Sequence, residues 1–320
     1  MIFLILLAAL ALFAAILYFM LYQAVTRVWG AKDGRCMEIL RNMGGAGHLD
    51  FYENKPWGEC RITSFDETEL YGRYLECGNA KKTAILVHGY GMTGLIMLRF
   101  APAYYEAGCH VLMVDMRAHG KSGGKAVAYG QEERHDLAAW IDFIAQKDPE
   151  QRIILHGESM GAATALQYLG AYSLSDALPD NVRAAVVDCP YTNAYDAAEA
   201  AGRVWFRMPT RPFMKPLNWI YGLVNGVTLE EVDTLALIPT IRTPLLFICG
   251  GRDEIFPLEM EKKLYDAAAG EKEMHVFAEA GHARSYALQP ERYDALIRDF
   301  QKQHLYPDLE QEQETGLDRC

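Results

Sequence analysis

The stretch Gly157-Glu158-Ser159-Met160-Gly161 is the most informative part of the sequence. A short apolar run precedes it and a run of small residues follows it, which predicts the order strand, tight turn and helix. A serine at the centre of such a turn exposes its hydroxyl at the end of the strand, where only small neighbours leave room for the bend. An ordinary turn with Ser159 capping the helix would also fit the pattern, because the chain has 27 glycines. The rest of the sequence must decide between the two.

Two polar residues later in the chain follow buried strands in the order that a serine nucleophile requires. Asp253 comes just after the apolar run 244–249, and His282 comes just after the run 274–277. The carboxyl ends of parallel strands share one edge of a sheet, so we expect both side chains to reach Ser159. His282 would then remove the proton of Ser159, and Asp253 would orient the imidazole.

Other polar residues are rivals for these roles or have structural roles. Glu254 and Asp188 are the alternative candidates for the acid. His156 and His275 lie inside predicted strands, which favours structural, hydrogen-bonded side chains over catalytic ones. Glu158, at the variable position of the turn, is expected to pair with a nearby base.

A glycine-rich loop follows an earlier strand, in the stretch 87–91 (Val-His-Gly-Tyr-Gly). Its position predicts that the backbone N–H of Tyr90 stabilises an oxyanion together with that of Met160, and that His88 braces the loop. Residues 89–94 also match G-x-G-x-x-G, and Asp115 ends the next strand, which is the pattern of a nicotinamide dinucleotide site. That interpretation leaves the serine turn and the strand-end aspartate and histidine unexplained, so we favour serine chemistry.

The N-terminal segment has a different composition from the rest of the chain. Residues 2–26 carry no charged side chain, and residues 2–21 are almost wholly apolar, which is long enough to cross a bilayer. Basic residues follow this stretch but none precedes it, unlike a cleaved signal peptide. We predict a retained transmembrane anchor at residues 1–26, with the catalytic domain in the cytoplasm by the positive-inside rule. A buried hairpin or core helix is the alternative.

From residue 56 to 305, short apolar runs alternate with helical stretches. This alternation predicts an α/β fold with a doubly wound, mostly parallel sheet, opened by an antiparallel hairpin. The predicted strands are 60–65, 70–75, 83–87, 110–115, 152–156, 182–188, 244–249 and 274–277. The predicted helices lie near 96–107, 131–146, 160–171, 258–268 and 290–303. Residues 27–55 are expected to be a connector, and residues 306–320 a disordered acidic tail.

The stretch 191–241 breaks the alternation, because no strand is evident in it. Its prolines and aromatic residues predict a small helical cap over the carboxyl edge of the sheet, where open α/β sheets bind ligands. The aromatic residues assigned to a substrate pocket are Trp205, Phe206, Trp219 and Tyr221. The same rings would serve equally well as the internal core of the cap.

The bulk composition excludes several classes of function. The net charge is -11 and no run of Lys or Arg is present, which argues against nucleic acid as a partner. The seven cysteines are scattered and include no C-x-x-C pair, which argues against a disulfide framework and against a zinc site. No metal or organic cofactor is expected, because an activated serine and an oxyanion hole suffice.

The order of these motifs resembles the α/β-hydrolases of the monoglyceride-lipase and proline-iminopeptidase-like branch, and especially their membrane-anchored bacterial members. The motifs that carry the resemblance are 87–91, 115–122, 156–161, 250–253 and 281–283. The resemblance implies the α/β-hydrolase fold, a catalytic triad of Ser159, Asp253 and His282, and a structural role for the loop 115–122. It says little about the substrate.

The sequence therefore predicts a membrane-anchored serine hydrolase, an esterase or lipase-like enzyme that cleaves an acyl or lipid ester through an acyl-enzyme intermediate. The nearest alternative is a serine aminopeptidase-like enzyme, in which the cap residues Glu230, Glu231 and Asp233 would recognise a substrate amine. A catalytically silent binding protein on the same fold is the alternative from another class. The oligomeric state stays open.

Overall fold

The computed structural model describes residues 31–43 and 46–305, together with a few isolated positions before residue 31. In this part of the chain, no helix has the length and apolar character needed to span a bilayer. The anchor predicted at residues 1–26 falls mainly on residues outside the described part, and the acidic tail predicted at 306–320 falls wholly outside it.

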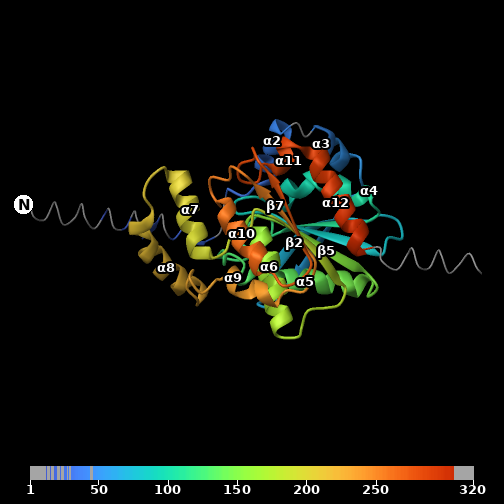
Figure 1. Cartoon of the computed structure of the whole chain (residues 1–320). Helices are drawn as coiled ribbons and strands as arrows, with labels where there is room; N and C mark the ends of the chain where they lie inside the picture. Colours follow the sequence, from blue (N-terminus) through green and yellow to red (C-terminus); the bar gives the residue numbers. More distant parts are fainter. Residues whose placement is uncertain are drawn as a thin grey trace, which may run out of the picture.

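An eight-stranded sheet lies at the centre of the molecule, in the order β1-β2-β4-β3-β5-β6-β7-β8 (Figure 1). The strands are β1 (Gly58–Thr63), β2 (Glu69–Leu75), β3 (Lys82–Val87), β4 (His110–Asp115), β5 (Arg152–Glu158), β6 (Val182–Asp188), β7 (Leu245–Gly250) and β8 (Lys272–Phe277). β2 pairs antiparallel with both β1 and β4, and the other neighbours are parallel. The predicted mostly parallel sheet with an opening hairpin is confirmed.

The central strands are apolar along their whole length because both of their faces are covered. In β3, Ile85 and Val87 belong to one hydrophobic cluster, whereas Ala84 and Leu86 belong to a second cluster. Alternate residues of a strand point to opposite faces, so the two clusters are the two faces of the sheet. This two-sided burial explains why the strands read as continuous apolar runs.

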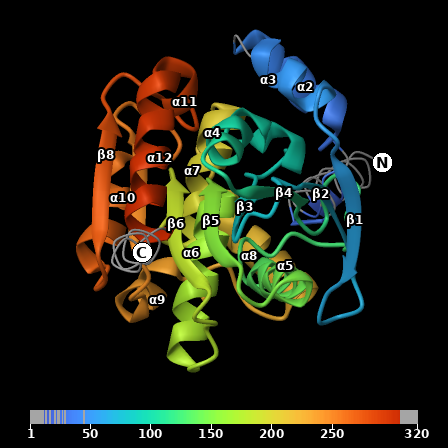
Figure 2. The ribbon, with the colours of Figure 1, turned by 90° about the vertical axis from the view of Figure 1, so that its right-hand side faces the viewer.

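Helices cover both faces of the sheet (Figure 2). α5, α6 and α10 contribute side chains to the first cluster, and α2, α4 and α12 contribute to the second. The helices around the sheet are α2 (Asp33–Asn42), α3 (Ala46–Glu53), α4 (Ala101–Glu106), α5 (Glu133–Lys147), α6 (Met160–Leu174), α10 (Leu258–Ala267), α11 (Ser285–Leu288) and α12 (Pro290–Leu305). The helix predicted near 96–107 is a 3₁₀ helix, η1 (Gly94–Arg99), followed by α4.

The stretch expected to be a connector contains two helices, α2 and α3. Cys36 and Leu40, four residues apart, are the buried side chains of α2 and belong to the second cluster. Only two of the four apolar residues in these ten positions are buried, so the sequence does not show which face of the helix is packed. The helix forms because these two side chains pack on the body of the protein, which tertiary context can impose on a weakly periodic segment.

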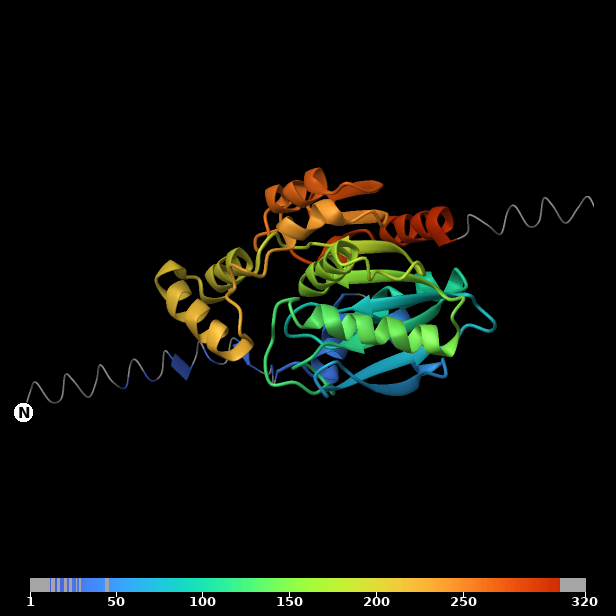
Figure 3. The same ribbon diagram turned by 90° about the horizontal axis from the view of Figure 1, so that it is seen from below.

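The stretch 191–241 forms the predicted helical cap. It contains α7 (Ala194–Phe206), α8 (Arg211–Asn225), α9 (Thr234–Leu237) and the 3₁₀ helix η2 (Ile238–Thr240). Met214, Leu217 and Tyr221 are buried at spacings of three and four, so α8 packs inward along one stripe. In Figures 1 and 3, α7 and α8 project beyond the sheet at one end of the molecule.

Candidate active site

Ser159 occupies the sharp turn between β5 and α6. Its backbone lies at φ 55° and ψ -115°, a conformation that side-chain-bearing residues rarely adopt. Holding a residue there costs about 1–3 kcal/mol and requires support from the surroundings. Part of that support comes from the Ser159 N–H, which donates to the carbonyl of Asp188 at 2.8 Å.

The glycines around Ser159 are required by the close approach of other backbone. A Cβ atom on Gly157 would collide with the carbonyl of Gly161, and one on Gly161 would collide with the carbonyl of Val87. A Cβ atom on Gly89 would lie 3.2 Å from that of Ser159. The G-x-S-x-G pattern therefore reflects packing of the turn against the end of β3, and an ordinary capping turn would not need it.

The three residues predicted to act together form one hydrogen-bond chain. The Ser159 hydroxyl and His282 Nε2 are 2.9 Å apart, and His282 Nδ1 lies 2.7 Å from Asp253 Oδ2. The side chain of Asp253 is fully buried, whereas that of His282 is 14 % exposed. The imidazole thus has an acceptor behind it and a hydroxyl in front of it, which is the geometry that activates a serine.

The loops that carry Asp253 and His282 are themselves held in place. Asp253 Oδ1 accepts hydrogen bonds from the backbone N–H groups of Ile255 and Phe256, at 2.8 and 2.7 Å. The ring of Phe256 meets the edge of the His282 ring with 4.8 Å between centroids. Both oxygens of Asp253 are therefore used, and the imidazole is packed from the side.

The rival acids occupy other environments. Asp188 Oδ2 accepts a hydrogen bond from the Tyr293 hydroxyl at 2.8 Å, and burial raises the pKa of Asp188 to about 6. Glu254 is exposed. Of the three candidate acids, the structure places Asp253 on the imidazole.

Cys189 lies beside this chain and was not singled out in the sequence. Its thiol, the carboxylate of Asp253 and the imidazole of His282 offer metal-ligating atoms within 4.8 Å of one another. Burial raises the pKa of the Cys189 thiol, which keeps it protonated, and the other two groups bond to each other. A thiol in this state packs as a small apolar group rather than as a thiolate ligand.

The loop after β3 lies against the serine turn. His88 Nε2 accepts from the backbone N–H of Met116 at 2.9 Å, and Nδ1 donates to the Gly89 carbonyl at 2.7 Å. Burial lowers the pKa of His88 to about 4, so the ring is neutral. His88 thus braces the loop, as the sequence predicts. Met160 is the first residue of α6, where a backbone N–H has no partner within the helix.

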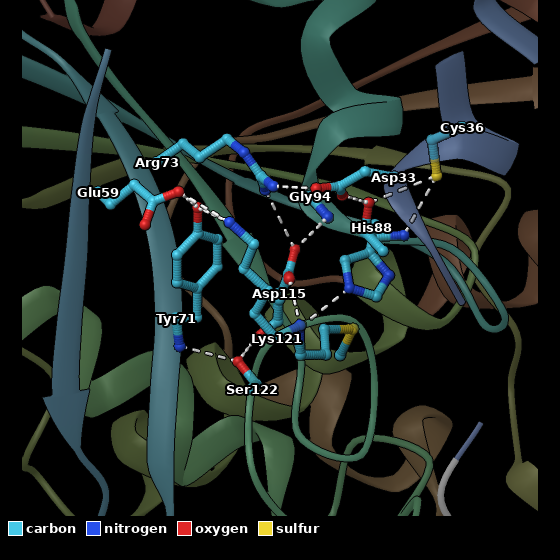
Figure 4. Close-up of polar contacts among 12 residues, drawn as sticks. Asp33, Cys36, Glu59, Tyr71, Arg73, His88, Gly94, Asp115, Lys121 and Ser122 are labelled. Carbon is cyan, nitrogen blue, oxygen red and sulfur yellow. Dashed lines mark hydrogen bonds and ion pairs between the residues drawn. The ribbon is translucent and has the colours of Figure 1, made fainter. Parts of the chain in front are cut away.

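Asp115 is the centre of a polar network behind this loop (Figure 4). Its carboxylate accepts from the backbone N–H groups of Gly94 and Lys121, at 2.7 and 2.8 Å, and forms an ion pair with Arg73 at 3.6 Å. Arg73 also pairs with Asp33 of α2. Through these bonds, α2 and the loop 115–122 hold the residues that follow His88.

This network rules out the dinucleotide interpretation of residues 89–94. In a dinucleotide site the acidic residue after the second strand would face a ribose, but both oxygens of Asp115 face backbone N–H groups of the protein. A Cβ atom on Gly94 would collide with the carbonyl of Val114, so this glycine allows two segments of chain to touch. The match to G-x-G-x-x-G is coincidental.

Glu158 and His156 have the structural roles predicted for them. The base that pairs with Glu158 is Arg99, and both side chains are buried. His156 lies between the hydroxyls of Tyr104 and Tyr293, at 3.0 and 3.1 Å. Arg99 lies 59 positions before its partner and only the fold brings the two together.

The cap contributes aromatic rings to the neighbourhood of the site, but not all those predicted. Trp205 stacks on Tyr90 with 5.8 Å between ring centroids, and Tyr90 stacks on Tyr129 at 6.0 Å. Tyr221 is buried, contacts Tyr129 and donates its hydroxyl to the carbonyl of Ala128. Tyr129 lies in a loop outside every motif, so the sequence analysis had no reason to choose it.

One of the predicted pocket residues is placed differently, and the prediction for another is not tested. Trp219 is 63 % exposed, and two residues of separation put it on the opposite face of α8 from Tyr221. The side chain of Phe206 lies outside the described part of the structure. The structure therefore brings Trp205 and Tyr221 toward the site and directs Trp219 outward.

A cleft of about 250 Å³ separates α7 from α10 next to the site. It is lined by Asp196, Glu199, Ala200, Arg203, Pro257, Glu259, Met260 and Lys263. Pro257 follows Phe256, whose ring contacts His282, so one wall of the cleft is continuous with the loop that holds the imidazole. Charged side chains of both signs lie around this cleft, but most of its exposed lining is apolar.

Comparisons with known proteins agree with the fold. A family model described as the alpha/beta hydrolase fold matches residues 83–213. The chain is 30 % identical over 266 residues to the uncharacterized protein YqkD of Bacillus subtilis, covering 82 % of this chain and 86 % of that one. It is 22 % identical over 211 residues to a lysophosphatidylserine lipase of Xenopus tropicalis, covering 60 % of this chain and 50 % of that one. A solved structure of an esterase from Pyrococcus furiosus is similar, with a TM-score of 0.65, 26 % identity and coverage of 79 % of this chain and 92 % of that one.

Proposed function

We propose that this chain, which belongs to the α/β-hydrolase family, is a serine esterase that uses Ser159, His282 and Asp253. The observation that carries the proposal is the hydrogen-bond chain from Asp253 through His282 to Ser159, on a turn that holds the serine in a strained backbone conformation. The similarity to an esterase and to a lysophosphatidylserine lipase supports an ester as the substrate.

In the first half of the proposed reaction, His282 Nε2 takes the proton of the Ser159 hydroxyl while Oγ attacks the ester carbonyl carbon. The tetrahedral intermediate carries its negative charge on the former carbonyl oxygen. The backbone N–H groups of Tyr90 and Met160 are the proposed donors to that oxygen. His282 then gives its proton to the leaving alcohol oxygen, the ester bond breaks, and the acyl group stays on Ser159.

In the second half, water replaces the alcohol. His282 removes a proton from the water, hydroxide adds to the acyl carbon, and collapse of the second tetrahedral intermediate returns the proton to Ser159 and releases a carboxylic acid. Asp253 stabilises the imidazolium formed in each half, and its bonds to Ile255 and Phe256 keep it aligned. The scheme needs only the ester, water and these protein groups: ester and water become a carboxylic acid and an alcohol, and the protein is returned unchanged.

The surroundings of Ser159 favour an apolar acyl group and a polar leaving group. Tyr90, Tyr129 and Trp205 form a continuous stack of rings beside the site, which suits a hydrocarbon chain. The cleft between α7 and α10 begins beside the loop that holds His282. Its lining is mostly apolar, but charged side chains of both signs lie around it and could bind the polar part of an alcohol. A lysolipid, a monoacylglycerol or a similar acyl ester combines both features.

The aminopeptidase alternative depends on three cap acids, Glu230, Glu231 and Asp233, as the site for a substrate amine. In the structure, each of these acids already has a hydrogen-bond partner within the cap. Glu231 accepts hydrogen bonds from the backbone and the hydroxyl of Thr228, and Asp233 caps α9 through the N–H of Ala236. Glu230 accepts from Asn218. All three acids are used within the cap, which leaves the ester as the better-supported substrate.

We also propose that the chain is a single-pass membrane protein, with the anchor at residues 1–26 and the domain in the cytoplasm. The support is the charge-free apolar stretch 2–21 and the basic residues that follow it. Where the chain enters the domain, Val25 is buried and Thr26 pairs with Ala126. Alkaline extraction of membranes from expressing cells tests the anchor, and protease access in sealed vesicles tests its orientation.

The proposed chemistry is tested with the full chain in detergent, using p-nitrophenyl esters from acetate to palmitate. We expect hydrolysis with a preference for medium or long acyl chains, complete loss in Ser159→Ala, and labelling of Ser159 by a fluorophosphonate. Fluorophosphonate labelling without ester hydrolysis would show a reactive serine with another substrate, and aminoacyl-arylamide turnover would then identify a peptidase. No labelling of the folded protein would contradict the proposal and favour a silent binding protein.

A further inference from the structure

The cap exposes large apolar side chains. Trp205, Met208, Trp219 and Leu223 are 55, 43, 63 and 65 % exposed. All four belong to α7, α8 or the turn that joins them. Exposing two tryptophan side chains to water is energetically unfavourable. A group of such side chains at one end of a molecule therefore indicates a surface that contacts an apolar partner.

Basic side chains accompany these apolar residues. Between residues 202 and 216 the sequence has four basic side chains, Arg203, Arg207, Arg211 and Lys215, and no acidic one. The whole chain has a net charge of -11, so the segment 202–216 is a positive stretch in an acidic chain. All four are exposed, although Arg211 also pairs with Glu199 at 3.2 Å.

The spacing on α8 places the two kinds of side chain on one face. Arg211, Lys215, Trp219 and Leu223 are four residues apart in turn and therefore form a single stripe along the helix. The buried residues Met214, Leu217 and Tyr221 lie on the other side. A helix that packs inward along one stripe and exposes basic and apolar residues along the opposite stripe has the composition of an interfacial helix.

We propose that this cap surface, made of Trp205, Met208, Trp219 and Leu223 with Arg207, Arg211 and Lys215, docks on an anionic phospholipid bilayer. Tryptophan favours the boundary between headgroups and acyl chains, and arginine and lysine are attracted to anionic headgroups. A protein partner with an apolar groove would explain the tryptophans, but the basic residues between them favour a lipid surface. The inference goes beyond ester hydrolysis and does not depend on it.

The point where the chain enters the domain lies on the same side as the cap. The carbonyl of Val25 accepts from the N–H of Val127, and Ala128, the next residue, accepts the hydroxyl of Tyr221 from α8. Val25 therefore lies close to α8 in the structure. The helices α7 and α8, which carry the cap surface, project at one end of the molecule (Figure 3).

Docking would bring the bilayer to the candidate active site. Trp205 belongs to the cap surface and also stacks on Tyr90, which follows the glycine that lies against Ser159. An acyl ester leaving the bilayer would therefore meet the ring stack of Trp205, Tyr90 and Tyr129 before it reached the serine. The proposal thus gives a path from the lipid surface to the site.

The test is quenching of tryptophan fluorescence in the full chain reconstituted in nanodiscs of phosphatidylcholine and phosphatidylglycerol, with and without bromine on the acyl chains. We expect brominated lipid to quench Trp219, so that Trp219→Phe lowers the quenched fraction. The control is Leu174→Trp, an exposed position at the end of α6, where a new tryptophan should not be quenched. An unchanged quenched fraction in Trp219→Phe would overturn the proposal.

A matched pair of charge reversals tests the basic residues. Arg211→Glu with Lys215→Glu on α8 should lower the quenched fraction toward that of Trp219→Phe, because two attractive charges become repulsive. Arg298→Glu with Lys302→Glu, also exposed and four apart but on α12, should leave it unchanged. Equal effects of the two pairs would contradict the role of the cap surface.

Hydrolysis of a short soluble ester in the same samples separates this inference from the proposed function. The α8 charge reversals should leave that rate unchanged, because neither residue contacts the candidate active site in the described structure. Normal hydrolysis without quenching of Trp219 would disprove docking alone, and quenching without hydrolysis would disprove the esterase proposal alone. Failure of the full chain to remain with the discs would also overturn the docking proposal.

Discussion

The carboxyl edge of the sheet and the cap hold their functional groups under opposite conditions. At the edge, the carboxylate of Asp253 is fully buried and both of its oxygens accept hydrogen bonds from fixed donors. In the cap, Trp205 and Trp219 are more than half exposed. Fixed, buried dipoles are what a charged transition state needs, whereas adaptable, exposed rings are what a variable apolar ligand needs. Under the proposed function, reactivity and substrate recognition would be divided between these two parts of the molecule.

The largest expected loss of activity follows a substitution at the carboxyl edge of the sheet. Ser159→Ala removes the only atom that forms the proposed covalent bond, so kcat for p-nitrophenyl butyrate should fall about 10⁵-fold. The thermal unfolding midpoint should change little, because the lost hydroxyl is small and the backbone is held by its neighbours. A variant that kept most of the wild-type rate would place the chemistry elsewhere and break the comparison.

The next largest loss of activity is expected when the acid behind His282 is replaced, and a second buried acid provides the control. Asp253→Asn should lower kcat about 10⁴-fold, because an amide at this position favours the wrong imidazole tautomer. Asp188→Asn keeps an acceptor for Tyr293 and should lower kcat less than about tenfold. Steady-state kinetics of both variants at one pH would decide, and similar losses in the two would contradict the assignment.

Two ion pairs, one buried beside Ser159 and one exposed in the cap, should differ in how much they stabilise the fold. Arg99→Met leaves Glu158 as an uncompensated buried charge and should lower the free energy of unfolding by about 3–5 kcal/mol. Arg211→Met breaks an exposed pair with Glu199 in the cap and should cost less than about 1 kcal/mol. Denaturant unfolding measures both. Adding Glu158→Met to Arg99→Met should recover part of the loss, and a further loss of similar size would contradict the buried-charge argument.

The buried acid Glu261 of α10 should make the stability of the fold depend on pH. Burial raises the pKa of Glu261 to about 9, so the folded protein keeps a proton that the unfolded chain releases near its ordinary value of 4.5. This stabilising contribution is complete below pH 4.5 and is lost as the pH rises toward 9. Glu261→Gln should reduce that decline and raise the free energy of unfolding at pH 8, by up to about 5 kcal/mol from the shift in pKa. Glu259→Gln, exposed on the same helix, is the control and should change little.

The smallest effect is expected in the cap. Trp205→Ala removes the ring that stacks on Tyr90 and should lower kcat/KM for a long-chain p-nitrophenyl ester several-fold, or about 1 kcal/mol. Trp219→Ala, on the outward face of α8, should leave kcat/KM for the same soluble substrate unchanged. If both substitutions had equal effects, the division of the cap into an inner and an outer face would be wrong.

Local sterics and the pattern of apolar residues made much of the fold predictable from the sequence. The strand, the tight turn and the helix around Ser159 could be predicted because a turn that admits only small residues acts over five positions. The apolar runs predicted the parallel sheet for a similar reason, since burial on both faces removes alternation from a strand. The two helices α2 and α3 escaped prediction, because α2 is held by only two buried side chains, Cys36 and Leu40.

Only the tertiary structure decided which distant groups meet. The sequence left three acids open for His282, and the packing of the loop around Phe256 places Asp253 on the imidazole while Tyr293 binds Asp188. Arg99 and Glu158 are 59 positions apart, and Trp219 and Tyr221 differ only in the side of α8 that they occupy. Turns and strands depend on neighbours along the chain, which the sequence displays, whereas partners and faces depend on how separate elements pack, which a linear pattern does not record.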